Sequence, residues 1–192
     1  MFNKIFLLSL FILITGCSTH NYKDDRYGQL NIEINEYSTE IATFAQWNEN
    51  YAVTVKHASN VPNSVYQSDI YDLQFFKKKS VGNIPEWSYS NEKDIVSMIG
   101  YTEVNSDNKI IKKGKDLGTA DFLIKNKYRM VDTTIIKGMS GGPVINNKNK
   151  LVGINIGYTH NPVFIKDKEI IVSVFLSYEA IQEEWLKFEK NI

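Results

Sequence analysis

Apolar and polar residues alternate along short stretches of this chain, and this period of two is typical of half-buried β-strands. Within residues 30–35, aliphatic side chains alternate with polar ones. The apolar stretches 41–47 and 51–55 flank the polar turn 48–50 and predict a hairpin. Further strands are predicted at 72–76, 95–99 and 151–156. Short strands at this spacing predict an all-β fold, either a sandwich or a barrel.

The last segment of the chain has a different period. Ile181, Trp185 and Phe188 recur at i, i+4 and i+7, which places them on one face of a helix. Ser177 is the predicted N-cap, and Glu179 lies in the first turn, where a carboxylate interacts favourably with the helix dipole. The pattern predicts a C-terminal helix that closes a β-rich body.

Residues 1–16 are predicted to be a lipoprotein signal peptide. Lys4 precedes an apolar run, residues 5–14, that is too short to span a bilayer. Ile14-Thr15-Gly16-Cys17 resembles a bacterial lipobox. Cys17 is the only cysteine, so no disulfide can form within the chain, and lipid attachment gives this thiol a role. Cleavage before Cys17 and acylation would anchor the protein to a membrane.

The residues after the cysteine predict where the protein lies. Residues 17–26 are polar and are interpreted as a tether between the lipid and a domain at 27–192. By resemblance to lipoprotein sorting, Ser18 in place of an aspartate favours the outer membrane, facing the periplasm, in a Gram-negative cell. The predicted localisation is the bacterial cell envelope. The 22 basic residues balance 22 acidic ones, which gives no indication of a nucleic-acid partner.

Residues 138–143, Gly-Met-Ser-Gly-Gly-Pro, are the most informative stretch of the chain. Glycines adopt backbone angles that other residues avoid, so a tight turn can direct its N–H groups at one point, as an oxyanion hole requires. A serine hydroxyl also needs a base, usually a histidine, to become a nucleophile. One of the three histidines, His57, follows the strand-like stretch 51–55 and precedes a small residue.

These motifs resemble those of the trypsin-like serine protease family, in its compact bacterial branch without disulfides, over residues 27–190. The motif around Ser140 is specific, whereas Thr54-Val55-Lys56-His57-Ala58 matches the family's Thr-Ala-Ala-His pattern in part. The resemblance implies two six-stranded antiparallel barrels, with a boundary near 100–115, and a C-terminal helix. The first barrel would be trimmed, because few residues separate His57 from the next motif.

The resemblance also implies a serine endopeptidase that cleaves a protein or peptide substrate through an acyl-enzyme. Ser140 would be the nucleophile and His57 the general base, and the backbone N–H groups of Gly138 and Ser140 would form the oxyanion hole. No metal or organic cofactor is implied, because the sequence lacks the His and Cys clusters that metal sites use. No oligomeric state follows from the sequence.

Three aspartates compete for the third position of the triad. Asp72 lies in Asp-Leu-Gln-Phe-Phe-Lys, which resembles the family's Asp-Leu-Ala-Leu-Leu-Lys, and Asp94 lies in Asp-Ile-Val, which resembles Asp-Ile-Ala-Leu. About five or six strands of about five residues each must fit between this aspartate and Ser140. Asp72 lies 68 positions before Ser140 and Asp94 only 46, so the spacing favours Asp72 over Asp94, and Asp69 remains a third candidate.

The resemblance gives limited information on specificity. Thr134 would lie near the base of the primary substrate pocket, and Gly157 and Tyr158 would form its wall. Thr134 is not acidic, and glutamyl endopeptidases have a histidine where this chain has Asn155, so neither a basic nor an acidic preference is supported. Met139 replaces the aspartate that pairs with the new N-terminus of activated trypsin, so activation of that kind is not expected.

Two other interpretations use the same residues. Gly138-x-Ser140-x-Gly142, with His160 downstream, also fits the nucleophile elbow of esterases, but an elbow leads into a helix and the residues after Pro143 are β-branched. The other alternative is a catalytically inactive protease-fold lipoprotein that acts as a binding module. The presence of all three triad residue types argues against it. His160 is interpreted first as a loop residue.

Overall fold

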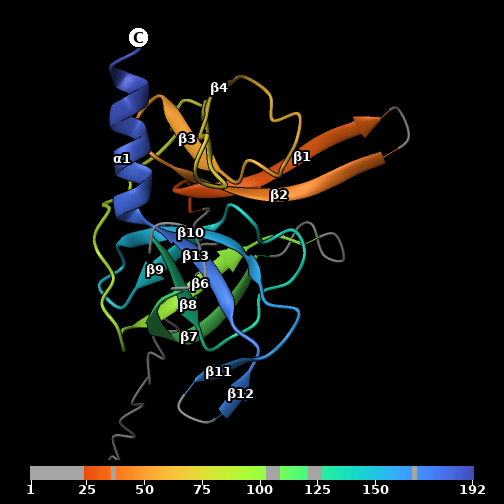
Figure 1. Ribbon diagram of the computed structural model, residues 1–192. Helices are drawn as coiled ribbons and strands as arrows, with labels where there is room; N and C mark the ends of the chain where they lie inside the picture. Colours follow the sequence, from red (N-terminus) through yellow and green to blue (C-terminus); the bar gives the residue numbers. More distant parts are fainter. Residues whose placement is uncertain (1–23, 36–37, 103–108, 121–126, 166–167) are drawn as a thin grey trace, which may run out of the picture.

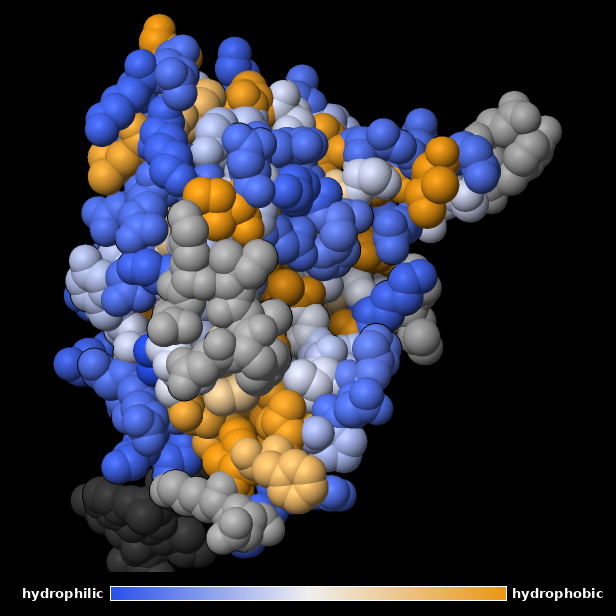
Figure 2. Space-filling view, in the orientation of Figure 1, coloured by the Kyte–Doolittle hydropathy of each residue, from blue (hydrophilic) through white to orange (hydrophobic). Residues whose placement is uncertain are grey.

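The structure, a computed structural model, describes residues 24–35, 38–102, 109–120, 127–165 and 168–192. Its N-terminal half is an antiparallel sheet with the strand order β1-β2-β3-β5-β4. The strands are Tyr27–Asn35 (β1), Ser38–Gln46 (β2), Tyr51–Thr54 (β3), Ser64–Gln67 (β4) and Gln74–Lys77 (β5). β1 and β2 form a long hairpin that projects beyond the rest of the molecule (Figures 1 and 2).

The C-terminal half is a closed antiparallel barrel with the cyclic order β10-β13-β8-β7-β6-β9. Its strands are Ile95–Gly100 (β6), Ile110–Thr119 (β7), Tyr128–Val131 (β8), Pro143–Asn146 (β9), Leu151–Tyr158 (β10) and Ser173–Ser177 (β13). A small hairpin, Val163–Ile165 (β11) and Lys168–Ile170 (β12), lies between β10 and β13 in the chain. Figure 1 shows the sheet and the barrel as two layers, one above the other.

The all-β fold with a C-terminal helix is confirmed, with two differences from the expected arrangement. The first barrel is replaced by a five-stranded sheet that is not closed among the described strands. The cause is the short interval between His57 and Asp72, which holds a single described strand, β4. The boundary is also earlier than residues 100–115, because β6 already pairs with β7 and β9 of the barrel.

The helix Tyr178–Glu189 (α1) follows directly after β13 and runs beside the N-terminal sheet (Figure 1). The ring of Trp185 lies 5.1 Å from the rings of both Tyr51 and Phe75, measured between centroids. Ser177 is the N-cap residue, as predicted, but its hydroxyl makes no capping hydrogen bond. No helix among the described residues is long and apolar enough to cross a membrane.

One apolar cluster joins the sheet, the barrel and the helix, and a further cluster lies within each half. The joining cluster contains fully buried residues from the sheet (Val53, Leu73, Phe75), the barrel (Leu151, Ile154, Leu176) and the helix (Ala180, Ile181). Burial of one such aliphatic or aromatic side chain stabilises the fold by about 1.5–3 kcal/mol. The two halves therefore share one apolar cluster, and residues at their junction are held from both sides.

Candidate active site

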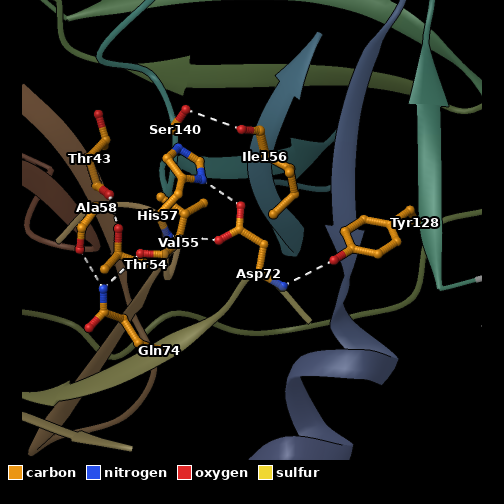
Figure 3. Close-up of polar contacts among 10 residues, drawn as sticks. All are labelled: Thr43, Thr54, Val55, His57, Ala58, Asp72, Gln74, Tyr128, Ser140 and Ile156. Carbon is orange, nitrogen blue, oxygen red and sulfur yellow. Dashed lines mark hydrogen bonds and ion pairs between the residues drawn. The ribbon is translucent and has the colours of Figure 1, made fainter. Parts of the chain in front are cut away.

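His57 lies in a turn directly after β3, and a buried glutamine of β5 holds this turn. Gln74 pairs with Thr54 across the sheet, and its side chain is fully buried beneath the turn. The Nε2 group of Gln74 donates to the carbonyls of Val55 and Ala58, at 2.8 Å each (Figure 3). The carbonyls of Val55 and Ala58, on either side of His57, are thus fixed, while 52% of the His57 side chain stays exposed.

Asp72 lies two residues before β5 and contacts His57 twice. Its Oδ2 atom is 2.5 Å from Nδ1 of the His57 ring, and its Oδ1 atom accepts the backbone N–H of His57 at 2.9 Å. The carboxylate can only accept a hydrogen bond, so the proton of a neutral His57 ring belongs on Nδ1. The lone pair of Nε2 then remains available to take a proton from another group.

The backbone of Asp72 is held from the other half of the molecule. Its N–H donates to the hydroxyl of Tyr128 in β8, at 3.0 Å. Figure 3 shows Asp72 between His57 on one side and Tyr128 on the other. A barrel side chain therefore fixes the position of an aspartate that belongs to the sheet.

The pairing shifts the acid–base properties of both side chains. The hydrogen bond and the negative charge of Asp72 raise the pKa of His57 above its usual value, against the opposing effect of burial, and the carboxylate of Glu40 adds to the rise. Burial pushes the pKa of Asp72 upward, but hydrogen bonds and charge from His57 outweigh it, so this pKa lies below its usual value. The pair favours an ionised aspartate beside an imidazole that is more basic than usual.

The other two candidate aspartates lie elsewhere. Asp94 is in the turn before β6, where its carboxylate accepts the N–H of Asn91 at 3.0 Å. Asp69 is exposed in the turn after β4. The structure therefore brings Asp72, and neither Asp94 nor Asp69, to His57.

Lys56 is a departure from the family pattern with a structural explanation. Its ammonium group donates to the carbonyl of Ser68 at 2.6 Å. The hydroxyl of Ser68 in turn accepts the N–H groups of Ile70 and Tyr71, directly before Asp72. Lys56 thus joins the turn of the histidine to the turn of the aspartate. Sequence reasoning missed this role and those of Gln74 and Tyr128, because each contact joins residues that share no local motif.

The segment with Ser140 consists of two consecutive turns. The N–H of Met139 donates to the carbonyl of Ile136, and the N–H of Gly142 donates to the carbonyl of Met139, at 3.1 Å each. Gly138 and Gly141 occupy the third positions of these turns with φ of +93° and +81°, angles that type II turns place on glycine. The side chain of Met139 is fully buried in the barrel, where an unpaired aspartate would be costly.

This segment lies directly against the sheet that carries His57. Thr43 of β2 donates twice, from its N–H to the carbonyl of Ser140 and from its hydroxyl to the carbonyl of Gly138, at 2.8 Å each. A Cβ atom on Gly141 would lie 2.1 Å from both the Thr43 carbonyl oxygen and the Thr54 hydroxyl. Only glycine fits here, and its absent side chain lets the serine approach the strand that precedes His57.

The Ser140 hydroxyl donates to the carbonyl of Ile156 at 3.2 Å (Figure 3). A hydroxyl has one proton, so in this state it is not directed at His57. Rotation about the Cα–Cβ bond of Ser140 would release it. Neither the N–H of Gly138 nor that of Ser140 donates to another of the described residues. Two free N–H groups beside a serine are what an oxyanion hole requires.

The predicted pocket residues lie on neighbouring parts of the barrel. Thr134 is exposed, and the residues on either side of it are tied to Ser173: the N–H of Ile135 donates to the Ser173 hydroxyl at 2.8 Å, and that hydroxyl donates to the carbonyl of Thr133 at 2.7 Å. Ser173 pairs with Tyr158 across β10 and β13. A Cβ atom on Gly157 would meet nothing within 4 Å, so the space beside it is open.

His160 is an exposed residue after β10, and its ring contacts Tyr158 at 5.2 Å between centroids. Ser140 is followed by the strand β9 and not by a helix, which excludes the esterase elbow. Among the described residues, no three His, Cys, Asp or Glu side chains could together hold a metal ion. A cavity of about 500 Å³ lies apart from all these groups, and it is lined by Asp24, Asp25, Arg26, Asn83, Ile84, Pro85, Glu86, Lys109, Lys148, Asn149 and Lys150.

The closed barrel, the second sheet and the C-terminal helix give this chain the fold of the trypsin-like serine proteases, among them the HtrA-type enzymes. The serine endoprotease of Yersinia pestis superimposes with a TM-score of 0.66 and 16% identity, over 85% of this chain and 62% of that chain. The HtrA-type protease AlgW with tripeptide superimposes with a TM-score of 0.61 and 16% identity, over 83% of this chain and 58% of that chain. An inactive mutant of Rv3671c from M. tuberculosis superimposes with a TM-score of 0.62 and 11% identity, over 86% of this chain and 87% of that chain.

This chain thus spans less than two thirds of the first two of these structures. No family model and no curated protein sequence matches it. At 11–16% identity, the likeness shows the fold and leaves the chemistry to be argued from the site itself.

Proposed function

We propose that this protein is a serine endopeptidase that uses Ser140, His57 and Asp72. The observation that carries the proposal is the double contact of Asp72 with His57, together with a serine in a segment of two glycine turns that packs against β2 and β3. A carboxylate that only oriented a surface histidine would not need a second hydrogen bond to that histidine's backbone. The neighbours with this fold are serine proteases, and one of them is described with a bound tripeptide.

In the proposed reaction, Ser140 attacks the carbonyl carbon of a peptide bond while Nε2 of His57 takes the hydroxyl proton. The N–H groups of Gly138 and Ser140 stabilise the oxyanion that forms. His57 then protonates the leaving amine, and a water molecule hydrolyses the acyl-enzyme by the same steps in reverse order. Asp72 keeps the ring in the required tautomer and stabilises the imidazolium.

We further propose that the enzyme is anchored to the bacterial cell envelope by lipid on Cys17, facing the periplasm from the outer membrane in a Gram-negative cell. Cys17 lies outside the described residues, and so do residues 1–16 and most of the tether 17–26. The proposal rests on the lipobox and on the absence of any other cysteine from the sequence.

A second candidate function is a protease-fold binding protein without activity. The observation in its favour is the hydrogen bond from Ser140 to Ile156, which directs the hydroxyl away from the base. The two functions differ in the reactivity of the serine, because an activated hydroxyl is phosphonylated by fluorophosphonates and an inactive one is not.

The test compares the wild type with Ser140→Ala. The wild type should be labelled by a fluorophosphonate probe and should degrade an unstructured protein, and the variant should do neither while keeping the wild-type circular dichroism spectrum. No labelling of the wild type would favour the binding protein. Equal labelling of both proteins would show that another residue is the nucleophile.

A further inference from the structure

Asn155 is a fully buried polar residue of β10 that lies behind the Ser140 turn. Its Nδ2 group donates to the carbonyl of Met139 at 3.1 Å and to the carbonyl of Ile99 at 2.9 Å. Two carbonyl acceptors on one side fix the orientation of the amide, because the flipped amide would place its oxygen against them. The Oδ1 atom of Asn155 is buried and has no partner among the described residues.

Stability alone does not explain this asparagine. The Ile99 carbonyl needs a donor. The last pair between β6 and β9 is Met98 with Val144, so the residue of β9 that comes next, opposite Ile99, is Pro143, and proline has no N–H. Asn155 supplies that donor but leaves its own oxygen unpaired, so one buried orphan acceptor is exchanged for another. The carbonyl of Met139 already accepts the N–H of Gly142, so it does not need Asn155 as a donor.

The hydrogen bond from Asn155 to the Met139 carbonyl fixes the plane of a peptide group. A trans peptide is planar, and its C=O and N–H groups point in opposite directions. The peptide group that contains the Met139 carbonyl also contains the N–H of Ser140. When Asn155 and Gly142 hold this carbonyl toward the barrel interior, the Ser140 N–H must point outward, where it has no acceptor among the described residues.

We propose that Asn155 is a positioning residue for the oxyanion hole: its amide holds the Met139 carbonyl so that the Ser140 N–H faces the substrate. This inference rests on the proposed function of the site. Loss of one oxyanion donor typically lowers kcat by about 10²–10³-fold. An Asn155→Leu substitution keeps the shape of the side chain and removes its amide. We expect it to lower kcat by about 10²-fold at unchanged KM and with the same pH midpoint for His57.

A thionoester comparison separates this role from general damage to the site. The sulfur of a thionoester is a poorer hydrogen-bond acceptor than the oxygen of the matching ester, so its slower hydrolysis measures the contribution of the oxyanion hole. In the wild type, the ester should react much faster than the thionoester. In Asn155→Leu, the ratio of the two kcat/KM values should fall by about 10-fold or more, because the ester loses more than the thionoester.

Ser177→Ala is the matched control. Its hydroxyl is also a buried group without a partner, and it lies on β13, the strand that pairs with β10, away from the Met139 carbonyl. This variant should keep the wild-type ratio. If Asn155→Leu does not fold, Asn155→Ala is measured in the same way. Failure of both to fold would show that the residue is structural and would overturn the inference.

The outcomes for the function and for the positioning residue are distinct. An active wild type whose ester-to-thionoester ratio is unchanged in a folded Asn155 variant would refute the role of Asn155 and leave the protease intact. A wild type without hydrolysis that depends on Ser140 would refute the proposed function, and the inference with it. A reduced ratio, with folding preserved, would support both.

Discussion

Replacing Asp72 by asparagine converts one carboxylate oxygen into an NH₂ group, and the structure determines which one. The backbone N–H of His57 donates to Oδ1 at 2.9 Å, so the amide oxygen of the asparagine must occupy that place. The NH₂ group then faces Nδ1 of His57, where Oδ2 lies at 2.5 Å in the wild type. An NH₂ group can only donate, so the neutral ring must carry its proton on Nε2 and can no longer accept the proton of Ser140.

We therefore expect Asp72→Asn to lower kcat by about 10⁴-fold, the loss that the wrong histidine tautomer causes in a triad. At 1.36 kcal/mol for each factor of ten, this is about 5.4 kcal/mol of transition-state stabilisation. KM should change little, because the carboxylate faces the histidine and not the substrate. Asp94→Asn is the matched control, since an asparagine oxygen can still accept the N–H of Asn91 in an exposed turn. Its effect on stability should stay within about 0.5 kcal/mol.

The assay measures kcat and KM on a small ester and on a peptide for the wild type and both variants, with circular dichroism to verify folding. A collapse of kcat in Asp94→Asn but not in Asp72→Asn would contradict the assignment of the triad. Near wild-type kcat in both variants would show that hydrolysis does not depend on the tautomer of His57, and the derivation from the hydrogen-bond geometry would be wrong.

Three further predictions follow from the site and from the chain's first residues. Since His57 must be neutral to act as a base and its pKa is raised, kcat/KM should increase with pH through a midpoint above 6.5, and Asp72→Asn should move that midpoint down, as a pH profile would reveal. Gly141→Ala should lower Tm strongly, because a left-handed alanine costs about 1–2 kcal/mol and its Cβ would lie 2.1 Å from a carbonyl oxygen of β2. Gly157→Ala is the control: no atom lies within 4 Å of the new Cβ, so Tm should stay nearly unchanged. Cys17→Ser should move the protein from the detergent phase to the aqueous phase on fractionation, and persistence in the detergent phase would place the anchor elsewhere.

Local sequence could predict those parts of this molecule whose structure depends on residues close together in the chain. The alternation of residues 30–35, the hairpin 41–55 and the helix face of Trp185 and Phe188 all depend on a periodicity that is visible in the chain itself. Gly138 and Gly141, on either side of Ser140, are of the same kind, because both occupy a turn position that requires positive φ.

Counting strands led to Asp72 by reasoning that was partly wrong. The count assumed five or six strands between the aspartate and Ser140, but the described strands in that interval are β5, β6, β7 and β8. β7 alone takes ten residues, and the connection between β5 and β6 takes residues 78–94. Strand lengths and crossovers are set by which strands meet in space, and neither can be read from a single sequence.

The sequence could not reveal contacts between distant positions. Tyr128 lies 56 residues after Asp72, and Thr43 lies 95 residues before Gly138, so no spacing rule connects them. In the sequence, Asn155 stands out only because it occupies the position of the histidine of the glutamyl endopeptidases. Its burial and its hydrogen bond to the Met139 carbonyl depend on the closure of the barrel.

The departures from the family pattern around His57 are explained by the open five-stranded sheet that replaces the first barrel. In a closed barrel, strand pairing on all sides restrains the turns at the strand ends, whereas a five-stranded sheet leaves such turns with fewer neighbours. Lys56 and Gln74 occupy positions where the family pattern has alanine, and both donate hydrogen bonds to backbone carbonyls of the turns that carry His57 and Asp72. An alanine could make neither contact. The side chains therefore replace the restraint that the missing strand pairing would have provided, and a trimmed sheet can still hold the histidine and the aspartate in contact.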